Sequence, residues 1–287
     1  MKPFEVACHV KTDDMSAALF FLPTNPMMKR DDDDGTDVSG PQLLRSRFTE
    51  AMLPASTPDS KQLMMAAAEV AKTVEQSGRW PDINYTTVGD EGRSWWEAGS
   101  HLQRTIILAT AARKGEAFAA QAEQALRYWI VHDFSNSNWW WQWIGTPRAV
   151  AKALLLLSPT AAERLLPLAM PILSRSNYSH PGNPNEATNL VWMAGTRALV
   201  GSLTDNTSEI TVAYQKIEST VIINAFDEGL QEDGSYHQRE CAALYPSHRF
   251  VAVDYIMWLC FAQTERSCTL AGATVPSGLG RCYSSGA

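Results

Sequence analysis

The sequence predicts an all-α protein built from antiparallel pairs of helices. Up to about residue 230, most of the chain consists of Ala- and Leu-rich segments whose apolar residues recur at helical spacing. No reliable β alternation interrupts this part of the chain, and some of the loops between the segments are long and polar. Such pairs can wrap into a ring whose long loops line one face, where loops on a rigid scaffold commonly form a functional site.

Three segments are expected along the chain. Residues 1–43 are predicted to be poorly ordered, because the like-charge run at 31–35 is followed by Gly, Ser and Pro. Residues 44–238 are predicted to form the helical domain. Residues 239–287 contain four of the five cysteines and end in a stretch without helical period, so we expect a divergent helical or irregular tail there.

Apolar spacing and end signals locate the helices of this domain. Residues 59–77 are predicted to form an amphipathic helix, with Asp59 as its N-cap and Gly78 directly after its end. Residues 135–147 are expected to be a loop, with Pro147 at the start of the next helix. The remaining predicted helices, in chain order, span residues 94–114, 115–134, 148–157, 160–176, 187–203 and 208–226.

Composition excludes several classes of protein. The chain has 287 residues, of which 45% are hydrophobic and 19% charged, which excludes disorder throughout. The net charge of −7 does not suit bulk binding to nucleic acid or to an anionic membrane. No apolar run reaches the ~18–20 residues of a membrane span. The cysteines show no metal-binding spacing such as C-x-x-C.

Tryptophan is unusually concentrated. Eight of the ten tryptophans lie between Trp80 and Trp143, and four of them fall within residues 139–143. These four cannot all face inward from one helix, so we expect part of the cluster to line a surface or cleft. Indole faces stack on the C–H faces of sugar rings, and neighbouring polar side chains such as Asn138 and Arg148 can bind hydroxyls or carboxylates. The alternative is that two or three of these indoles only join helices.

Two polar groups of residues lie farther along the chain. Asn189 lies at a junction between a loop and a helix, where an asparagine can be simply an N-cap. Residues 232–238 form a turn rich in potential hydrogen-bond donors and acceptors.

In their order along the chain, these motifs resemble those of polysaccharide lyase family 8, which includes hyaluronate, chondroitin AC, xanthan and alginate lyases. The resemblance covers roughly residues 78–238. It is strongest at Asn138-Trp-Trp followed by Ile144-Gly-Thr-Pro-Arg148, where the family has an NWW…IG-x-P-[RQ] pattern. The other matching positions are Trp80 to Tyr85, Trp95, His101 with Arg104, Thr188-Asn189, and the Asp233 to Gln238 turn.

The resemblance implies an incomplete α/α toroid that cleaves a uronic-acid polysaccharide by β-elimination, without a metal or organic cofactor. Asn189 matches the amide that neutralises the substrate carboxylate while the proton at C5 leaves. Asn138, Trp139 and Trp140 match the residues that position the chain in the cleft. The resemblance also implies an extracellular, secreted protein, although the N-terminus lacks a clear signal peptide. Its expected partner is an acidic polysaccharide, not nucleic acid or membrane, and we expect a monomer.

The catalytic His and Tyr of the family are missing at their expected positions. The family has a His directly after Gln238 and a Tyr nine residues later, whereas this chain has Arg239 and His248 there. An Arg is not a useful base, because its pKa exceeds ~12. His237 and Tyr245 are the nearby candidates for proton transfer. The resemblance therefore indicates a carbon–oxygen lyase whose catalytic set is incomplete.

Several alternatives stay open from the sequence. Residues from about 239 onward are expected to come from a shifted reading frame, a misjudged intron or a decayed gene, with a divergent short protein as the alternative. The helical domain is expected to be a lyase fragment or a catalytically incomplete carbohydrate-binding toroid. His101 and Arg104 are expected to be a packed or solvated pair rather than a ligand site. A hydrolase would need two placed carboxylates, for which the candidates are Glu186, Asp227, Glu228, Glu232 and Asp233.

Overall fold

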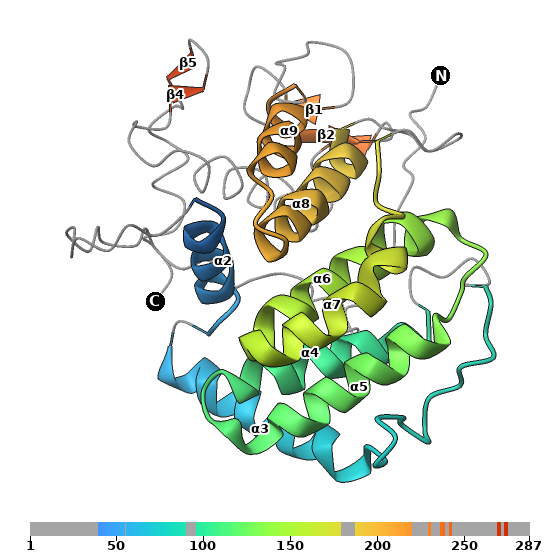
Figure 1. Ribbon diagram of the computed structural model, residues 1–287. Helices are drawn as coiled ribbons and strands as arrows, with labels where there is room; N and C mark the ends of the chain where they lie inside the picture. The colour runs from blue at the N-terminus through green and yellow to red at the C-terminus, as the bar shows by residue number, and fades with distance from the viewer. Residues whose placement is uncertain are drawn as a thin grey trace, which may run out of the picture.

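The computed structural model describes residues 40–54, 56–89, 96–178 and 187–219, together with short strands farther along the chain (Figure 1). Most of these residues are helical, because apolar side chains recur at helical spacing along them. The helices in chain order are α2 (Gly40–Ala51), α3 (Thr57–Thr73), α4 (Ser100–Ala112), the 3-10 turn η1 (Glu116–Phe118), α5 (Ala119–His132), the π-helix η2 (Trp141–Gly145), α6 (Thr146–Leu156), α7 (Pro159–Leu173), α8 (Ala187–Leu203) and α9 (Thr207–Glu218).

Five strands of two or three residues follow α9 among the described residues. β2 pairs antiparallel with β1 and β3, so that His237 lies opposite Gly229 on one side and Ala242 on the other. Elements this short do not change the fold class, and the predicted all-α architecture is confirmed. The strands are β1 (Gly229–Leu230), β2 (Tyr236–Gln238), β3 (Cys241–Ala242), β4 (Thr269–Leu270) and β5 (Ala273–Thr274).

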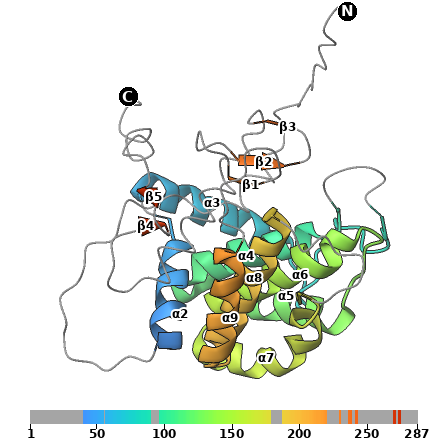
Figure 2. The same cartoon turned by 90° about the horizontal axis from the view of Figure 1, so that it is seen from above.

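The helices pack as successive antiparallel hairpins. α4 packs on α5, α6 on α7 and α8 on α9, while α4 contacts α6 and α6 contacts α8. The first helices of the three hairpins therefore form one layer, and the view from above shows α4, α6 and α8 next to one another (Figure 2). α2, although earliest among these elements, packs on the α8–α9 hairpin. This two-layer arrangement is the one expected of an α/α toroid.

α6 is the central helix because it is apolar on all sides. Its residues from Thr146 to Leu156 are buried except for Arg148, and Lys152 is covered as well. A helix that is apolar all round belongs in the interior, here between α4, α7 and α8. Arg148 is therefore the position at which this central helix presents a partly exposed cation.

The predicted helix over residues 59–77 has different ends in the structure. α3 begins at Thr57 with Ser56 as its N-cap, and the Ser56 hydroxyl accepts a hydrogen bond from the Asp59 N–H at 3.2 Å. The prediction of Asp59 as cap was wrong because Pro58 fits the first turn of a helix, which moves the start upstream. The helix ends at Thr73, so Gly78 belongs to the following turn.

Gly78 is required by a close approach between segments. Its φ is +89°, and a Cβ placed there would lie 2.3 Å from the carbonyl oxygen of Gln124 on α5. Only glycine combines that backbone conformation with that contact. The turn after α3 therefore lies directly on α5.

His101 is a structural residue of the core. Its side chain is fully buried, with Nε2 2.8 Å from the Ala125 carbonyl oxygen and Nδ1 2.9 Å from the Tyr85 hydroxyl. Burial lowers the pKa of His101 to about 3, so the imidazole is neutral at pH 7. Arg104 forms two hydrogen bonds with the Asp82 carboxylate, at 2.8 and 2.6 Å. The expected packed pair is thus two separate structural contacts.

No helix in the described part of the chain is long and apolar enough to cross a bilayer. The predicted boundaries at residues 43 and 238 stay predictions, although α2 already begins at Gly40.

Candidate functional site

The tryptophan-rich segment is helical, and the predicted loop over residues 135–147 was wrong in its second half. Residues 139–156 are helical without interruption, with the π-helix η2 between the first turn and α6. The Thr146 N–H donates to the carbonyl of Trp141, five residues earlier, which is the π pattern. Pro147 has no N–H to donate to the carbonyl of Trp143, so a wider turn is compatible with a proline at this point.

The π-helix changes which indoles are buried. Trp141 is 5% exposed and belongs to the core, whereas Trp139, Trp140 and Trp143 are half-buried. The Trp139 and Trp143 rings contact each other with centroids 5.7 Å apart. The segment therefore presents several partly accessible indole rings while one indole anchors it.

Gly145 allows two of these rings to pack against the backbone. A Cβ at this position would lie 2.6 Å from Cζ3 of Trp140 and 2.7 Å from Cε3 of Trp141. The two rings themselves meet edge to face, with centroids 5.1 Å apart. A glycine here thus determines the orientation of both indoles.

Of the four tryptophans at residues 139–143, Trp141 alone is buried in the core, so the alternative that two or three of them only join helices is not confirmed. Trp80, Trp96 and Trp129 are at most 2% exposed and pack in the core, as does Trp141. Trp95 lies outside the described residues. Among the tryptophans that the structure describes, the partly exposed ones are Trp192 on α8 and those at the start of the helix that continues into α6.

Asn138 uses its side chain to begin this helix. Its Oδ1 accepts a hydrogen bond from the Trp140 N–H at 3.0 Å, and its own N–H donates to Oδ1 of Asn136 at 2.8 Å. Because Oδ1 is engaged in this way, the structure gives Asn138 a role in shaping the segment in addition to the sugar contact predicted for it.

Asn189 is the third residue of α8, so it lies inside the helix and is not its N-cap. Its side chain is 9% exposed, and none of the described residues forms a hydrogen bond with it. A nearly buried amide with no hydrogen bond from the described residues differs from a core asparagine, whose polar atoms are normally all paired. The amide therefore has donor and acceptor capacity for a ligand.

Trp192 connects Asn189 to the tryptophan-rich segment. It lies three residues after Asn189, which places the two side chains on neighbouring positions of one helix face. The Trp192 ring meets the Trp140 ring edge to face with centroids 5.7 Å apart, and the Arg148 guanidinium lies 5.9 Å from the Trp192 centroid. Two motifs far apart in the sequence thus meet through one indole.

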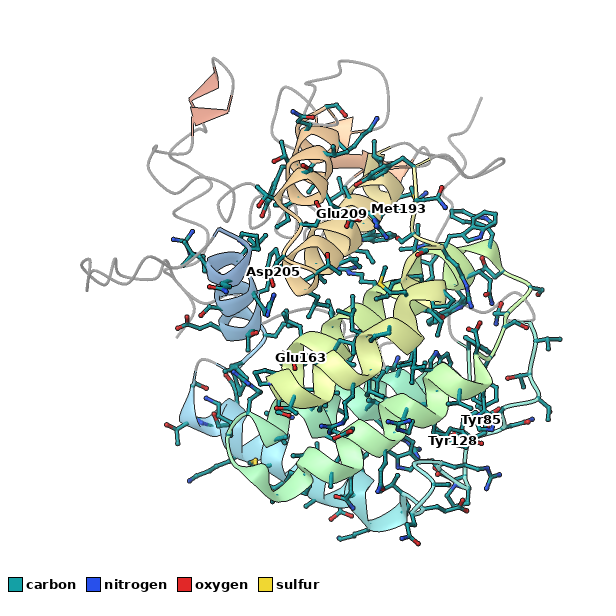
Figure 3. All side chains as sticks on the ribbon, viewed as in Figure 1. Tyr85, Tyr128, Glu163, Met193, Asp205 and Glu209 are labelled. Carbon is teal, nitrogen blue, oxygen red and sulfur yellow. The ribbon has the colours of Figure 1, made fainter. Side chains whose placement is uncertain are left out.

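Sequence reasoning missed Trp192. The available signal was its i+3 spacing from Asn189, but an isolated tryptophan in an apolar helix is usually core. Its indole N–H is buried and has no hydrogen-bond partner among the residues that the structure describes. Met193, labelled in Figure 3, marks this part of α8, and it lies well apart from Tyr128 on α5 and from Tyr85. The His101 contacts therefore belong to a separate region.

The two candidates for proton transfer are not placed by the structure. His237 lies in β2, where only its backbone pairing is described, and Tyr245 lies outside the described residues. The carboxylates considered for a hydrolase also lie outside them: Glu186, Asp227, Glu228, Glu232 and Asp233. Among the residues that are described, no group of three or more His, Cys, Asp or Glu side chains could hold a metal ion.

The family model for the N-terminal alpha-helical domain of polysaccharide lyase family 8 matches residues 59–247. This chain belongs to polysaccharide lyase family 8. The match includes the Trp139–Trp143 segment, Asn189 and the polar turn at 232–238. The family expected from the motifs is therefore confirmed.

A curated relative and several solved structures agree with this family. The chain is 27% identical over 175 residues to chondroitinase-AC of Pedobacter heparinus. This alignment covers 58% of this chain and 24% of that enzyme. The chain therefore spans about a quarter of the curated relative that it matches.

The similar structures include chondroitin AC lyase of Streptomyces coelicolor A3 in complex with chondroitin sulphate, with a TM-score of 0.64 and 18% identity over 83% of this chain and 34% of that chain. A chondroitinase AC lyase whose active site was revealed by oligosaccharide complexes has a TM-score of 0.61 and 19% identity, over 78% and 33%. A Paenibacillus xanthan lyase has a TM-score of 0.54 and 16% identity, over 69% and 21%. These likenesses confirm the incomplete α/α toroid for this family 8 chain.

Proposed function

We propose that this chain is the helical part of a lyase that cleaves a uronic-acid polysaccharide by β-elimination. In this proposal Asn189 binds the uronate carboxylate, and Asn138, Trp139, Trp140 and Arg148 hold the sugar chain. The observation that supports it most directly is the contact between Trp140 and Trp192, which joins the partly exposed indoles to the helix of Asn189. The proposal extends the family membership to an activity for this chain.

The chemistry requires stabilisation of a negative charge. The proton at C5 of a uronate is only weakly acidic, and its removal produces an enolate-like charge on the carboxylate. A neutral amide that donates to a carboxylate oxygen stabilises this charge more than it stabilises the ground state. The Asn189 amide suits this role because none of the described residues occupies it and its surroundings exclude most water.

The electron pair released at C5 forms the double bond between C4 and C5, and the oxygen at C4 leaves with a proton. His237 and Tyr245 are the proposed groups for taking the proton at C5 and returning one to the leaving oxygen. In this proposal Arg148 balances the charge of the acidic chain, and its guanidinium 5.9 Å from the centroid of the Trp192 ring supports that role. No cofactor enters this scheme.

The alternative is a binding module that holds the polysaccharide without cleaving it. It is favoured by Arg239 and His248 at the positions where the family has its catalytic His and Tyr. In either case the proposed partner is an acidic polysaccharide, and we propose that the protein acts outside the cell as a monomer.

Two measurements on one sample distinguish these proposals. Purified protein is mixed with chondroitin sulphate, hyaluronan or alginate, and ultraviolet absorbance reports the conjugated double bond of the elimination product. Tryptophan fluorescence reports binding in the same sample. New absorbance supports the lyase, fluorescence change without absorbance supports the binding module, and reducing ends without unsaturation would support a hydrolase. Neither signal with any of the three polymers would contradict both proposals.

A further inference from the structure

Arg175 lies just after α7 and contacts two elements at once. Its Nη1 donates to Oε1 of Gln142 at 3.0 Å, and its Nη2 forms an ion pair with the carboxylate of Asp133. Gln142 belongs to the π-helix of the tryptophan-rich segment, and Asp133 is the C-cap of α5. The planar guanidinium fork can serve both partners, which the single ammonium of a lysine does less well.

The hydrogen bonds continue from Gln142 to the indoles. Nε2 of Gln142 donates to the carbonyl of Asn136 at 3.2 Å. Oδ1 of Asn136 accepts from the Asn138 N–H at 2.8 Å, and Oδ1 of Asn138 accepts from the Trp140 N–H at 3.0 Å. An unbroken series of polar contacts therefore runs from Arg175 to the backbone of Trp140.

Several of these hydrogen-bonded groups are shielded from solvent. Asn136 is 5% exposed and the Arg175 side chain 22%, so water replaces these bonds poorly. Asp133 has a φ of +45°, an unusual conformation for a residue other than glycine. The ion pair with Arg175 helps to hold that conformation where the chain leaves α5 and enters the tryptophan-rich segment.

A second arginine provides a matched comparison. Arg164, within α7, donates to both carboxylate oxygens of Glu123 on α5, at 2.8 and 2.9 Å. This pair joins α5 to α7 within the helices, whereas Asp133 and Arg175 lie just after the ends of the same two helices. Both hydrogen bonds of Arg164 go to Glu123. The two arginines therefore differ in the link to Gln142, and the Arg164 side chain is also more exposed, at 51% against 22% for Arg175.

We propose that Arg175 is a positioning residue for the Trp139–Trp143 segment. Through Gln142 it sets the orientation of the indoles that stack on sugar rings, although it does not itself touch the sugar. It thereby determines the affinity for an acidic polysaccharide. This inference rests on the proposed function for its sugar ligand, while the positioning itself can be tested without a ligand.

The experiment compares Arg175→Ala, Gln142→Ala and Arg164→Ala with the unmodified full chain. Affinity for chondroitin sulphate, hyaluronan and alginate is measured by tryptophan fluorescence, packing of the indoles by near-ultraviolet circular dichroism, and stability by urea unfolding. Gln142→Ala keeps the ion pair of Arg175, so it tests the link even if Arg175→Ala fails to fold. The double variant Arg175→Ala/Gln142→Ala tests whether the two residues act through one connection.

We expect Arg175→Ala and Gln142→Ala each to weaken affinity about tenfold or more, since small misplacements of binding groups are costly. Both should alter the near-ultraviolet spectrum. The double variant should lose no more affinity than one of the single variants, because both residues act through the same connection. Arg164→Ala should keep affinity within about twofold and leave the spectrum unchanged, whatever its effect on stability, since surface pairs act locally.

Equal affinity in Arg175→Ala and the unmodified chain, or an equal loss in Arg164→Ala, would overturn the inference. If the unmodified chain binds none of the three polymers, the proposed function fails separately. The positioning role is then decided by circular dichroism alone: a spectrum changed in Arg175→Ala and Gln142→Ala but not in Arg164→Ala supports it, and unchanged spectra refute it.

Discussion

Trp140 and Trp192 meet edge to face, with ring centroids 5.7 Å apart and planes at 83°. One ring belongs to the tryptophan-rich segment before α6 and the other to α8, one turn beyond Asn189. The pair therefore joins the proposed sugar-binding indoles to the proposed carboxylate-binding amide.

Replacing Asn189 with alanine should abolish turnover and leave polysaccharide binding nearly intact. The amide is expected to act chiefly on the charge that develops as the proton leaves, so its loss affects the rate more than ground-state binding. Absorbance of the unsaturated product and tryptophan fluorescence measure the two effects separately. Unchanged turnover in Asn189→Ala would remove this residue from the mechanism.

Replacing Trp139 with alanine should weaken polysaccharide binding by ~1–3 kcal/mol, if stacking is comparable with that of other rings on aromatic side chains. Trp139 is half-buried, so the free energy of unfolding should change less than it does in a core variant such as Trp96→Ala. Fluorescence titration and urea unfolding of both variants test this contrast. A variant that binds as tightly as the unmodified chain would contradict the proposed stacking.

Substitutions of Trp192 test the contact between Trp140 and Trp192 itself. Trp192→Phe keeps an aromatic ring and removes a buried N–H for which the described part of the chain offers no hydrogen-bond partner, so stability should be unchanged or higher by about 1 kcal/mol. Trp192→Ala also loses the contact with Trp140, worth ~0.5–1.5 kcal/mol beyond its burial, and should weaken polysaccharide binding. Urea unfolding and fluorescence titration measure both variants, and equal behaviour of the two would argue against the junction.

Gly145→Ala should displace the Trp140 and Trp141 rings, because the added Cβ would lie 2.6 and 2.7 Å from them. The expected cost is ~1–3 kcal/mol of stability, typical of overpacking. Gly115→Ala is the control, since a Cβ there meets nothing within 4 Å. Urea unfolding and near-ultraviolet circular dichroism report the two effects, and a Gly145→Ala variant as stable as the control would show that the rings shift freely.

His101 should make the protein less stable in acid. Burial lowers its pKa from 6.5 to about 3, so below pH 6.5 the unfolded chain binds a proton that the folded chain does not. The contribution of neutral His101 to the free energy of unfolding is thus complete above pH 6.5. It falls by up to ~1.4 kcal/mol per pH unit as the pH decreases toward 3. Urea unfolding of the unmodified chain and His101→Gln at pH 7 and pH 5 isolates this contribution. Equal losses in both proteins would show that other groups dominate.

Most of the fold could be predicted from local patterns. The periods of α4 to α9 and the apolar character of α6 are visible in the residues themselves, because a helix places residues three or four apart on one face. The predicted ends of α3 were wrong, and so was the loop predicted over the residues before Pro147, which are helical. End signals such as Asp59 and Pro147 compete with neighbouring residues that satisfy the same backbone groups. The ordered motifs also predicted the family, which no single motif could have done.

The sequence by itself determined the helical class, the family and the candidate residues Asn138, Trp139, Trp140, Arg148 and Asn189. Only the tertiary structure decided that Trp141 is core, that Trp192 links Asn189 to Trp140, and that Arg175 reaches Gln142. The physical reason is the distance along the chain over which each kind of interaction acts. Helical period and motif spacing act over a few neighbouring residues, whereas burial of one indole and contact between two helices depend on how segments far apart in the chain pack together.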